Sequence, residues 1–278
     1  DTADEDVTHT GNVSLTASGD SGYSAVSTSV SVNIGDNDFG ASDAVINEFL
    51  ADKNSVDTGA FIEIYGSPNT DYSSLYILEI EGDSSSPTGN IDAVFQVGTT
   101  DANGFWTITD ADDSTADAEN GTVTYLLVQG FTGSAGDDID SDNDGTIDNA
   151  PWSSIIDGVA TFEGGTDIAY IADAAVVGLN SDFDGGSGQV GAASRVPDGQ
   201  DNDLTTDWVR NDYYGYGLSG GPATGTDGEG VNTPGASNQI FTDVTAPTIS
   251  TLTPANDSTT VVLADNLEAT FSEDIQKG

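Results

Sequence analysis

Residues 138–148 are the part of this chain whose residue types and spacing are best suited to chemistry. Asp140, Asp142 and Asp144 stand at alternate positions, and Gly145 follows where a tight loop must turn. Hard cations such as Ca²⁺ bind several oxygen ligands on a sharply curved backbone. The segment therefore predicts a structural Ca²⁺ site, and Ile147, two residues after the glycine, is expected to anchor the loop in a core.

The predicted ligands of this site are the carboxylates of Asp140, Asp142 and Asp144, the backbone carbonyl of Thr146, and Asp148 directly or through water. An EF-hand places a bidentate Glu at its twelfth position, which is Pro151 here, so the loop is not an EF-hand. The missing ligand must come from elsewhere, and Asp137 and Asp138 are the nearest acidic residues. A solvated acidic turn is the alternative, although three carboxylates this close would repel one another without a cation.

Other acidic groups resemble half-sites for a cation. They are Asp36 with Asp38, Asp182 with Asp184, and Asp198 with Asp201 and Asp203. The first pair lies at an expected domain junction, where an ion would tie the two sides together and where a polar linker is an equally good interpretation. For the others, the alternative is a Gly-rich turn with Asx hydrogen bonds.

The composition supports cation binding. The 278 residues include 48 acidic and 4 basic ones, for a formal net charge of -44. Such a chain repels itself unless cations neutralise it. We therefore expect folding that depends on Ca²⁺ as a cofactor, in an extracellular or cell-surface medium rich in that ion. The shortage of Lys and Arg argues against nucleic-acid partners, and no apolar stretch approaches the length of a membrane span.

Enzymatic chemistry finds little support in the chain. His9 is the one histidine, and the chain has no Cys, which excludes both a Cys nucleophile and disulfides. No phosphate-binding Gly-Lys-Ser/Thr loop occurs. Because acids are everywhere, no pair of carboxylates stands out as a hydrolase site. We predict a non-catalytic protein.

Short apolar runs with period-two alternation recur along the chain and predict strands. In the main body the expected strands are 45–51, 60–65, 76–81, 93–97, 104–109, 123–128, 155–162 and 168–177. Turn-rich segments separate them, which is typical of an all-β sandwich or barrel. Two further strands are expected at 12–18 and 25–34, and C-terminal strands at 261–263 and 267–271.

Residues 178–238 are mostly Gly, Asp, Asn, Ser and Pro, and predict a long ordered coil. Its aromatic anchors are Trp208, Tyr213, Tyr214 and Tyr216, which either cover a core edge or form a platform for stacking sugars. Arg195 and Arg210 are expected to fix the coil by pairing with carboxylates. The alternative is that they bind an acidic group of a glycan or partner.

The main body resembles the bacterial extracellular form of the lamin tail domain family. The likeness covers most of 44–238, including Val-Ile-Asn-Glu-Phe-Leu-Ala at 45–51 and Thr-Gly-Ala-Phe-Ile-Glu-Ile-Tyr at 58–65. Later matching segments are 157–160, 193–199, 207–211 and 232–236. The resemblance implies an immunoglobulin-like β-sandwich that serves as an accessory part of large secreted proteins, and it assigns no catalytic residue.

The two ends are similar to parts of bacterial Ig-like surface repeats. We therefore expect three regions: closing strands of one repeat at 1–39, the sandwich at 40–240, and opening strands of another repeat at 245–278. The predicted function is a Ca²⁺-stabilised structural or adhesion module that contacts neighbouring domains or other copies, in a surface layer or filament. The alternatives are an accessory targeting domain of a secreted nuclease or phosphatase, and a carbohydrate-binding module for surface glycans.

Overall fold

The computed structural model describes residues 9–16, 27–34, 44–51, 59–109, 118, 121–180, 183, 190–246, 248–255, 258–259, 266 and 268–272, the first two ranges as backbone only. These residues form fourteen strands and one 3₁₀ helix, η1 (Thr205–Asp207). The protein is all-β, as the alternating apolar runs predict.

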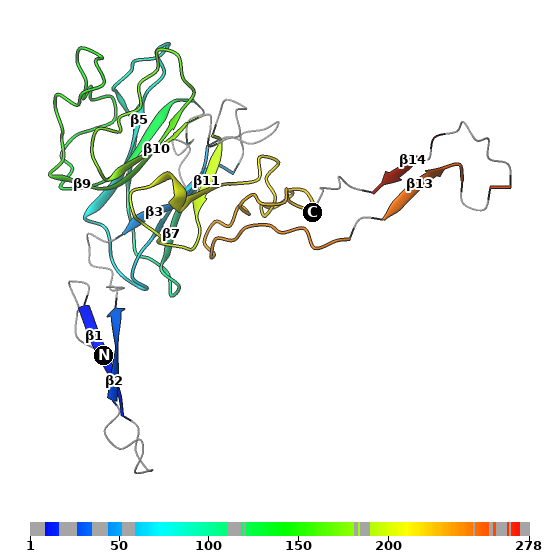
Figure 1. Ribbon diagram of the computed structural model, residues 1–278. Coiled ribbons are helices and arrows are strands. Elements are labelled where there is room, and N and C mark those ends of the chain that lie inside the picture. Colours follow the sequence, from blue (N-terminus) through cyan, green and yellow to red (C-terminus); the bar gives the residue numbers. More distant parts are fainter. Residues whose placement is uncertain are drawn as a thin grey trace. The chain divides into compact units, whose positions relative to one another are not determined.

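The central body contains two five-stranded sheets (Figure 1). The first has the order β10 (Val176–Asn180), β9 (Ser154–Phe162), β8 (Val123–Gln129), β5 (Leu75–Glu81), β6 (Ile91–Gln96). The second has the order β12 (Trp208–Arg210), β11 (Ala192–Arg195), β3 (Val45–Leu50), β4 (Phe61–Tyr65), β7 (Phe105–Thr109). All pairs in both sheets are antiparallel except β10 with β9, which is parallel.

The main core lies between the two sheets. Apolar side chains at alternate positions of facing strands meet there, and the ring of Phe49 lies 5.4 Å from that of Tyr125 and 6.0 Å from that of Trp208. Because side chains alternate between faces along a strand, each sheet also has an outer face. The result is an immunoglobulin-like β-sandwich whose outer faces must be covered or solvated.

Loops cover the outer face of the first sheet with a second apolar cluster. Leu78, Leu126 and Val128 from the strands pack there with Ile139 and Tyr170 from the loops. Each large apolar side chain that is fully buried in such a layer contributes about 1.5–3 kcal/mol to the stability of the fold. The acidic loop at 138–148 is therefore part of a packed layer.

The coil after β11 covers the outer face of the second sheet. A small apolar cluster of Leu50, Phe61 and Ala192 packs there with Leu218 from the coil. Beside it, strand register aligns a polar row across β11, β3, β4 and β7, made of Ser194, Glu48, Glu63 and Thr107. The coil buries the first three of these polar side chains completely.

Two predictions about strands are wrong. The expected strand at 168–177 exists only from Val176, because the Ile168 amide bonds the carbonyl of Gly82 and a turn at Asp173 interrupts the run. The expected coil at 178–238 contains the short strands β11 and β12. Their few apolar residues give too weak a pattern to be separated from the surrounding loops.

Each end of the chain contains a two-stranded hairpin. β1 (His9–Thr16) pairs with β2 (Ser27–Ile34) in a register that sets Val13 opposite Val30. β13 (Ile249–Thr253) pairs with β14 (Glu268–Phe271), and its side chains are exposed. Contacts divide the chain into the units Asp1–Phe241 and Thr242–Gly278. Within the described residues no helix has the length and apolar character needed to cross a membrane.

Candidate metal centres

The acidic loop at 138–148 is held at both ends. Ile139 is fully buried in the outer cluster of the first sheet, and Ile147 packs against the same cluster, as expected for a loop anchor. The Ile139 amide donates to the carbonyl of Gly89 at 2.9 Å, and the Asp148 amide donates to the carbonyl of Ile139 at 2.8 Å. Backbone hydrogen bonds and buried side chains therefore close the loop without any contribution from its carboxylates.

Three of the predicted ligand residues come together in this loop. Carboxylate oxygens of Asp140, Asp142 and Asp148 all lie within 4.8 Å of one another. Asp140 is fully buried, whereas Asp142 and Asp148 are exposed. One buried carboxylate beside two exposed ones is an arrangement that could hold a hard cation at the surface.

The Asp140 carboxylate is oriented by three donors. Its Oδ1 accepts from the Asp144 amide at 3.2 Å, and its Oδ2 accepts from the Gly145 amide at 2.9 Å and the Tyr170 hydroxyl at 3.0 Å. Gly145 has a φ of +86°, a conformation that favours glycine. The turn and the Tyr170 side chain thus fix the one ligand that cannot reach solvent.

The other predicted ligands make local hydrogen bonds. Oδ1 of Asp138 accepts from the Asp140 amide at 3.0 Å, and Oδ1 of Asp144 accepts from the Thr146 amide at 2.8 Å. Both are Asx-type turns that shape the loop. The structure therefore groups Asp148 with Asp140 and Asp142, and gives Asp138 and Asp144 turn-forming roles.

The carboxylates of the loop repel one another. The neighbouring charge of Asp144, followed by partial desolvation and the charges of Asp148 and Asp140, raises the pKa of Asp142. A bound cation would relieve this repulsion because it stabilises the ionised forms of all these groups at once. The repulsion among the carboxylates and the preference of hard cations for oxygen ligands thus both favour a cation at this place.

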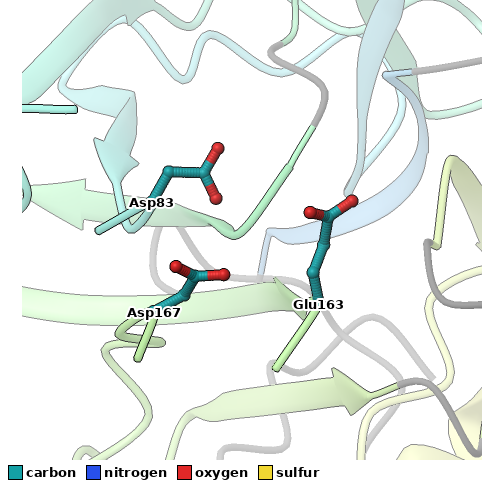
Figure 2. Close-up of side chains that lie close together, drawn as sticks. All are labelled: Asp83, Glu163 and Asp167. Carbon is teal, nitrogen blue, oxygen red and sulfur yellow. The ribbon is translucent and has the colours of Figure 1, made fainter. Parts of the chain in front are cut away.

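A second acidic group, Asp83, Glu163 and Asp167, lies elsewhere on the sandwich, with carboxylate oxygens within 4.8 Å of one another. Figure 2 shows these three side chains gathered at one place from positions just after β5 and β9 and from the β9–β10 connection. Partial burial, then the charges of Asp83 and Asp167, raises the pKa of Glu163. Sequence reasoning missed this group because 80 residues separate its first and second members.

Two of these carboxylates are already oriented by donors. Oδ1 of Asp83 accepts from the Thr122 amide at 3.0 Å. Oδ1 of Asp167 accepts from the amide and hydroxyl of Ser84, at 2.9 and 2.8 Å. The group could hold a cation, with Glu163 as the most exposed arm.

Arg195 pairs with carboxylates, as expected for a residue that fixes the coil. Its Nη2 lies 2.9 Å from Asp157 Oδ1 on the opposite sheet, and its Nη1 lies 3.0 Å from Asp201 Oδ1. The guanidinium also lies 4.6 Å from the ring of Trp208. Arg210 forms an ion pair with Glu229. Both arginines thus bind carboxylates of this chain.

The remaining predicted sites are dispersed or lie outside the described residues. Asp201 is bonded to Arg195 and Asp198 to the side chain of Asn47, so the expected group with Asp203 is not assembled. Trp208 is buried in the main core and cannot form part of a sugar platform, whereas Tyr213 and Tyr214 are 43% and 62% exposed. The half-site residues Asp36, Asp38, Asp182 and Asp184 lie outside the described residues.

Comparison with known protein families matches the C-terminal part of the chain. No curated protein and no solved structure shows significant similarity to the chain. Residues 243–278 match the model of a family described as a bacterial Ig-like domain. That segment contains β13 and β14, so the C-terminal unit of this chain is similar to a bacterial Ig-like domain.

Proposed function

We propose that this chain is a Ca²⁺-stabilised, non-catalytic structural module of a bacterial cell-surface or secreted protein. The Ig-like match of residues 243–278 supports the surface and structural class. The observation that carries the calcium part is the loop in which Asp140 is buried and fixed by three donors beside the carboxylates of Asp142 and Asp148.

The ion would act by fastening a covering layer to the sandwich. The loop covers the outer face of the first sheet through Ile139 and Ile147, and Tyr170 of the β9–β10 connection donates to Asp140. A cation bound by Asp140, Asp142 and Asp148 would hold the two ends of the acidic loop together, where their charges otherwise repel, and would keep Asp140 in place for the Tyr170 hydroxyl. The free energy of unfolding would rise with the logarithm of the free Ca²⁺ concentration above the Kd, because only the folded loop presents the ligands together.

The central body is further proposed to be a lamin-tail-like domain. The segments that carry this resemblance include β3 and β4, which lie side by side in the second sheet. The segments at 193–199 and 207–211 fall on β11 and β12, which extend the same sheet. Their gathering in one sheet supports the resemblance. Its role is to space or connect domains, with neighbouring domains or other copies of the chain as partners.

Thermal unfolding of the whole chain with and without Ca²⁺ tests this function. Free Ca²⁺ at about 100 times its Kd adds about 2.7 kcal/mol, which is about 5–11 °C for a domain of this size. We expect EDTA to remove this increase. Asp142→Ala should abolish most of the difference between the two buffers.

Asp92→Ala is the matched control, since it removes one exposed carboxylate on β6, outside both acidic groups. It should leave the response to Ca²⁺ unchanged. A response that survives Asp142→Ala but disappears in Asp167→Ala would transfer the site to the second acidic group. An unfolding temperature that is equal in Ca²⁺ and EDTA would reject the calcium proposal.

Glycan binding is a second candidate, favoured by the exposed rings of Tyr213 and Tyr214, which lie edge to face at 6.0 Å. Aromatic faces of this kind suit the C–H surfaces of sugars. Calorimetric titration with bacterial surface polysaccharides tests it, with Tyr214→Ala as the variant that should lose binding. Targeting of a secreted nuclease or phosphatase would instead show as an altered activity of that enzyme when this module is deleted.

A further inference from the structure

Two glutamates that face each other across neighbouring strands are both buried under the coil. Strand register sets Glu48 of β3 directly opposite Glu63 of β4, and each has an exposed fraction of 0%. Like charges directly opposite one another destabilise a sheet, and burial without a counter-ion makes this worse. The pair therefore needs a proton or a cation to be stable.

Within the part of the chain that the structure describes, the charges that act most strongly on this pair are acidic. The charge of Glu63 acts on Glu48, and the charge of Asp198 acts on Glu63. The side-chain amide of Asn47 donates to the carboxylates of both Glu63 and Asp198. The Arg195 side chain is directed to Asp157 and Asp201 instead. The elements packed around the pair thus offer it amides and hydroxyls in place of a counter-ion.

Every contact of Glu63 is that of an ionised carboxylate. Its Oε1 accepts from Asn47 Nδ2 at 3.0 Å, and its Oε2 accepts from the Gly235 amide at 2.5 Å and the Thr107 hydroxyl at 3.1 Å. Three donors to two oxygens favour the charged form. Glu63 is therefore the member of the pair that ionises first.

The contacts of Glu48 include one that needs a proton of its own. Its Oε1 accepts from Asn211 Nδ2 at 2.7 Å and from the Thr233 amide at 3.0 Å. Its Oε2 lies 3.2 Å from the Thr233 amide nitrogen, which also donates to it, and 3.2 Å from the Thr233 hydroxyl oxygen. That hydroxyl has one proton to donate, and a second acceptor competes for it.

The competing acceptor is the side-chain oxygen of Asn238, 2.8 Å from the Thr233 hydroxyl. The identity of that oxygen is fixed, because Nδ2 of Asn238 donates to the carbonyls of Asn47 and Arg195, at 3.2 and 3.0 Å. The Thr233 hydroxyl donates its one proton to Asn238, because that contact is the shorter of the two. The remaining contact, between the Thr233 hydroxyl oxygen and Glu48 Oε2, can then be a hydrogen bond only if Glu48 carries a proton on Oε2.

We propose that Glu48 is protonated at neutral pH and donates from Oε2 to the Thr233 hydroxyl, so that this one proton fastens the turn at 233–238 onto the sheet. The turn then binds both members of the pair, the neutral acid through Thr233 and the carboxylate of Glu63 through the Gly235 amide. Loss of the proton puts two charges on adjacent buried positions and removes the bond to the turn.

The electrostatics agree with this assignment. Burial, followed by the charge of Glu63, raises the pKa of Glu48 to about 8, and burial raises that of Glu63 to about 7. A carboxyl whose pKa is raised in the fold stabilises the fold fully below its unfolded pKa, and that contribution is lost as the pH rises through the folded value. The turn should therefore loosen progressively from about pH 4.5 to about pH 8.

The test is a ¹³C NMR titration of the Glu carboxyl carbons in the whole chain, in Ca²⁺ and in EDTA. We expect one buried glutamate to remain protonated through pH 6.5 and to titrate near neutral or mildly alkaline pH, equally in both buffers. Two buried carboxyls that are both ionised at pH 6.5 would overturn the proposal. So would a titration that Ca²⁺ abolishes, since a cation would then be neutralising the pair.

Two matched variants assign the proton to one residue. Glu48→Gln has an amide that can donate to Thr233, so it should fold and lose the dependence of amide exchange at Thr233 and Gly235 on pH. In the wild type, exchange corrected for its intrinsic base catalysis should rise by up to about tenfold per pH unit in this window. Glu63→Gln places a side-chain NH₂ group opposite groups that themselves donate to Glu63, so this variant should unfold at a lower temperature than Glu48→Gln. The reverse order of stability would refute the assignment to Glu48.

Discussion

Removal of the Asp157 carboxylate is predicted to be among the most damaging single changes to this fold. Asp157 is buried on β9, and its oxygens accept from the Ile46 amide at 2.7 Å, the Gly158 amide at 2.8 Å and Arg195 Nη2 at 2.9 Å. Ile46 and Arg195 belong to the second sheet and Asp157 to the first. The carboxylate therefore ties the two sheets of the sandwich together.

Asp157→Ala leaves the buried guanidinium of Arg195 with Asp201, two backbone carbonyls and the more distant Asp207 carboxylate at 3.9 Å, and leaves the Ile46 amide without its acceptor. Breaking a buried ion pair from one side costs about 3–5 kcal/mol. For a domain of this size that is a decrease of about 6–20 °C in unfolding temperature. Burial also raises the pKa of Asp157 to about 6, against the opposing charge of Arg195.

Urea unfolding at pH 7.5 in constant Ca²⁺ measures this loss, followed by tryptophan fluorescence because Trp208 stacks against Arg195. The control is Glu229→Ala, which breaks the more exposed pair of Arg210 with Glu229 and should cost about 1 kcal/mol or less. If the two variants differ by less than about 0.5 kcal/mol, which is the size of an ordinary surface effect, the reasoning about the buried tie is refuted.

Two further changes test the core and the loop. Phe49→Ala removes the ring that contacts Tyr125 and Trp208 and should cost about 3–5 kcal/mol in urea unfolding; a loss below that of Glu229→Ala would contradict the position of the main core. Gly145→Ala forces a side chain into a φ of +86° and should cost about 1–2 kcal/mol. Gly136→Ala, at a φ of +89° with open space around it, should cost a similar amount but, unlike Gly145→Ala, should leave the shift of unfolding temperature by Ca²⁺ intact. Equal Ca²⁺ responses in the two glycine variants would argue against a cation in the loop.

The alternation of apolar residues was enough to predict most strands of the sandwich. β3, β4 and β8 are each found within a residue or two of their predicted limits, because their apolar runs are long and bounded by turn residues. The run at 168–177 misled, because Ile168 and Tyr170 are buried by packing on the outer cluster and not by membership of a strand. Burial leaves the same apolar signal in both cases.

The acidic loop was visible in the sequence because its residues are neighbours in the chain. The group of Asp83, Glu163 and Asp167 was not, since only the pairing of β5, β8 and β9 in one sheet brings their ends together. The grouping of Asp148 rather than Asp144 with Asp140 and Asp142 likewise depends on how the loop closes through the Asp148 amide.

The sequence by itself determined which residues alternate along each strand, how charged the chain is, and where the acidic loop stands. Tertiary structure alone decided what lies over each outer face. Glu48 and Glu63 occupy polar positions that a period-two pattern places toward solvent, yet the coil buries them both. A strand's periodicity specifies the face of a side chain, whereas its protonation depends on distant residues such as Thr233 and Gly235 that fold back over that face.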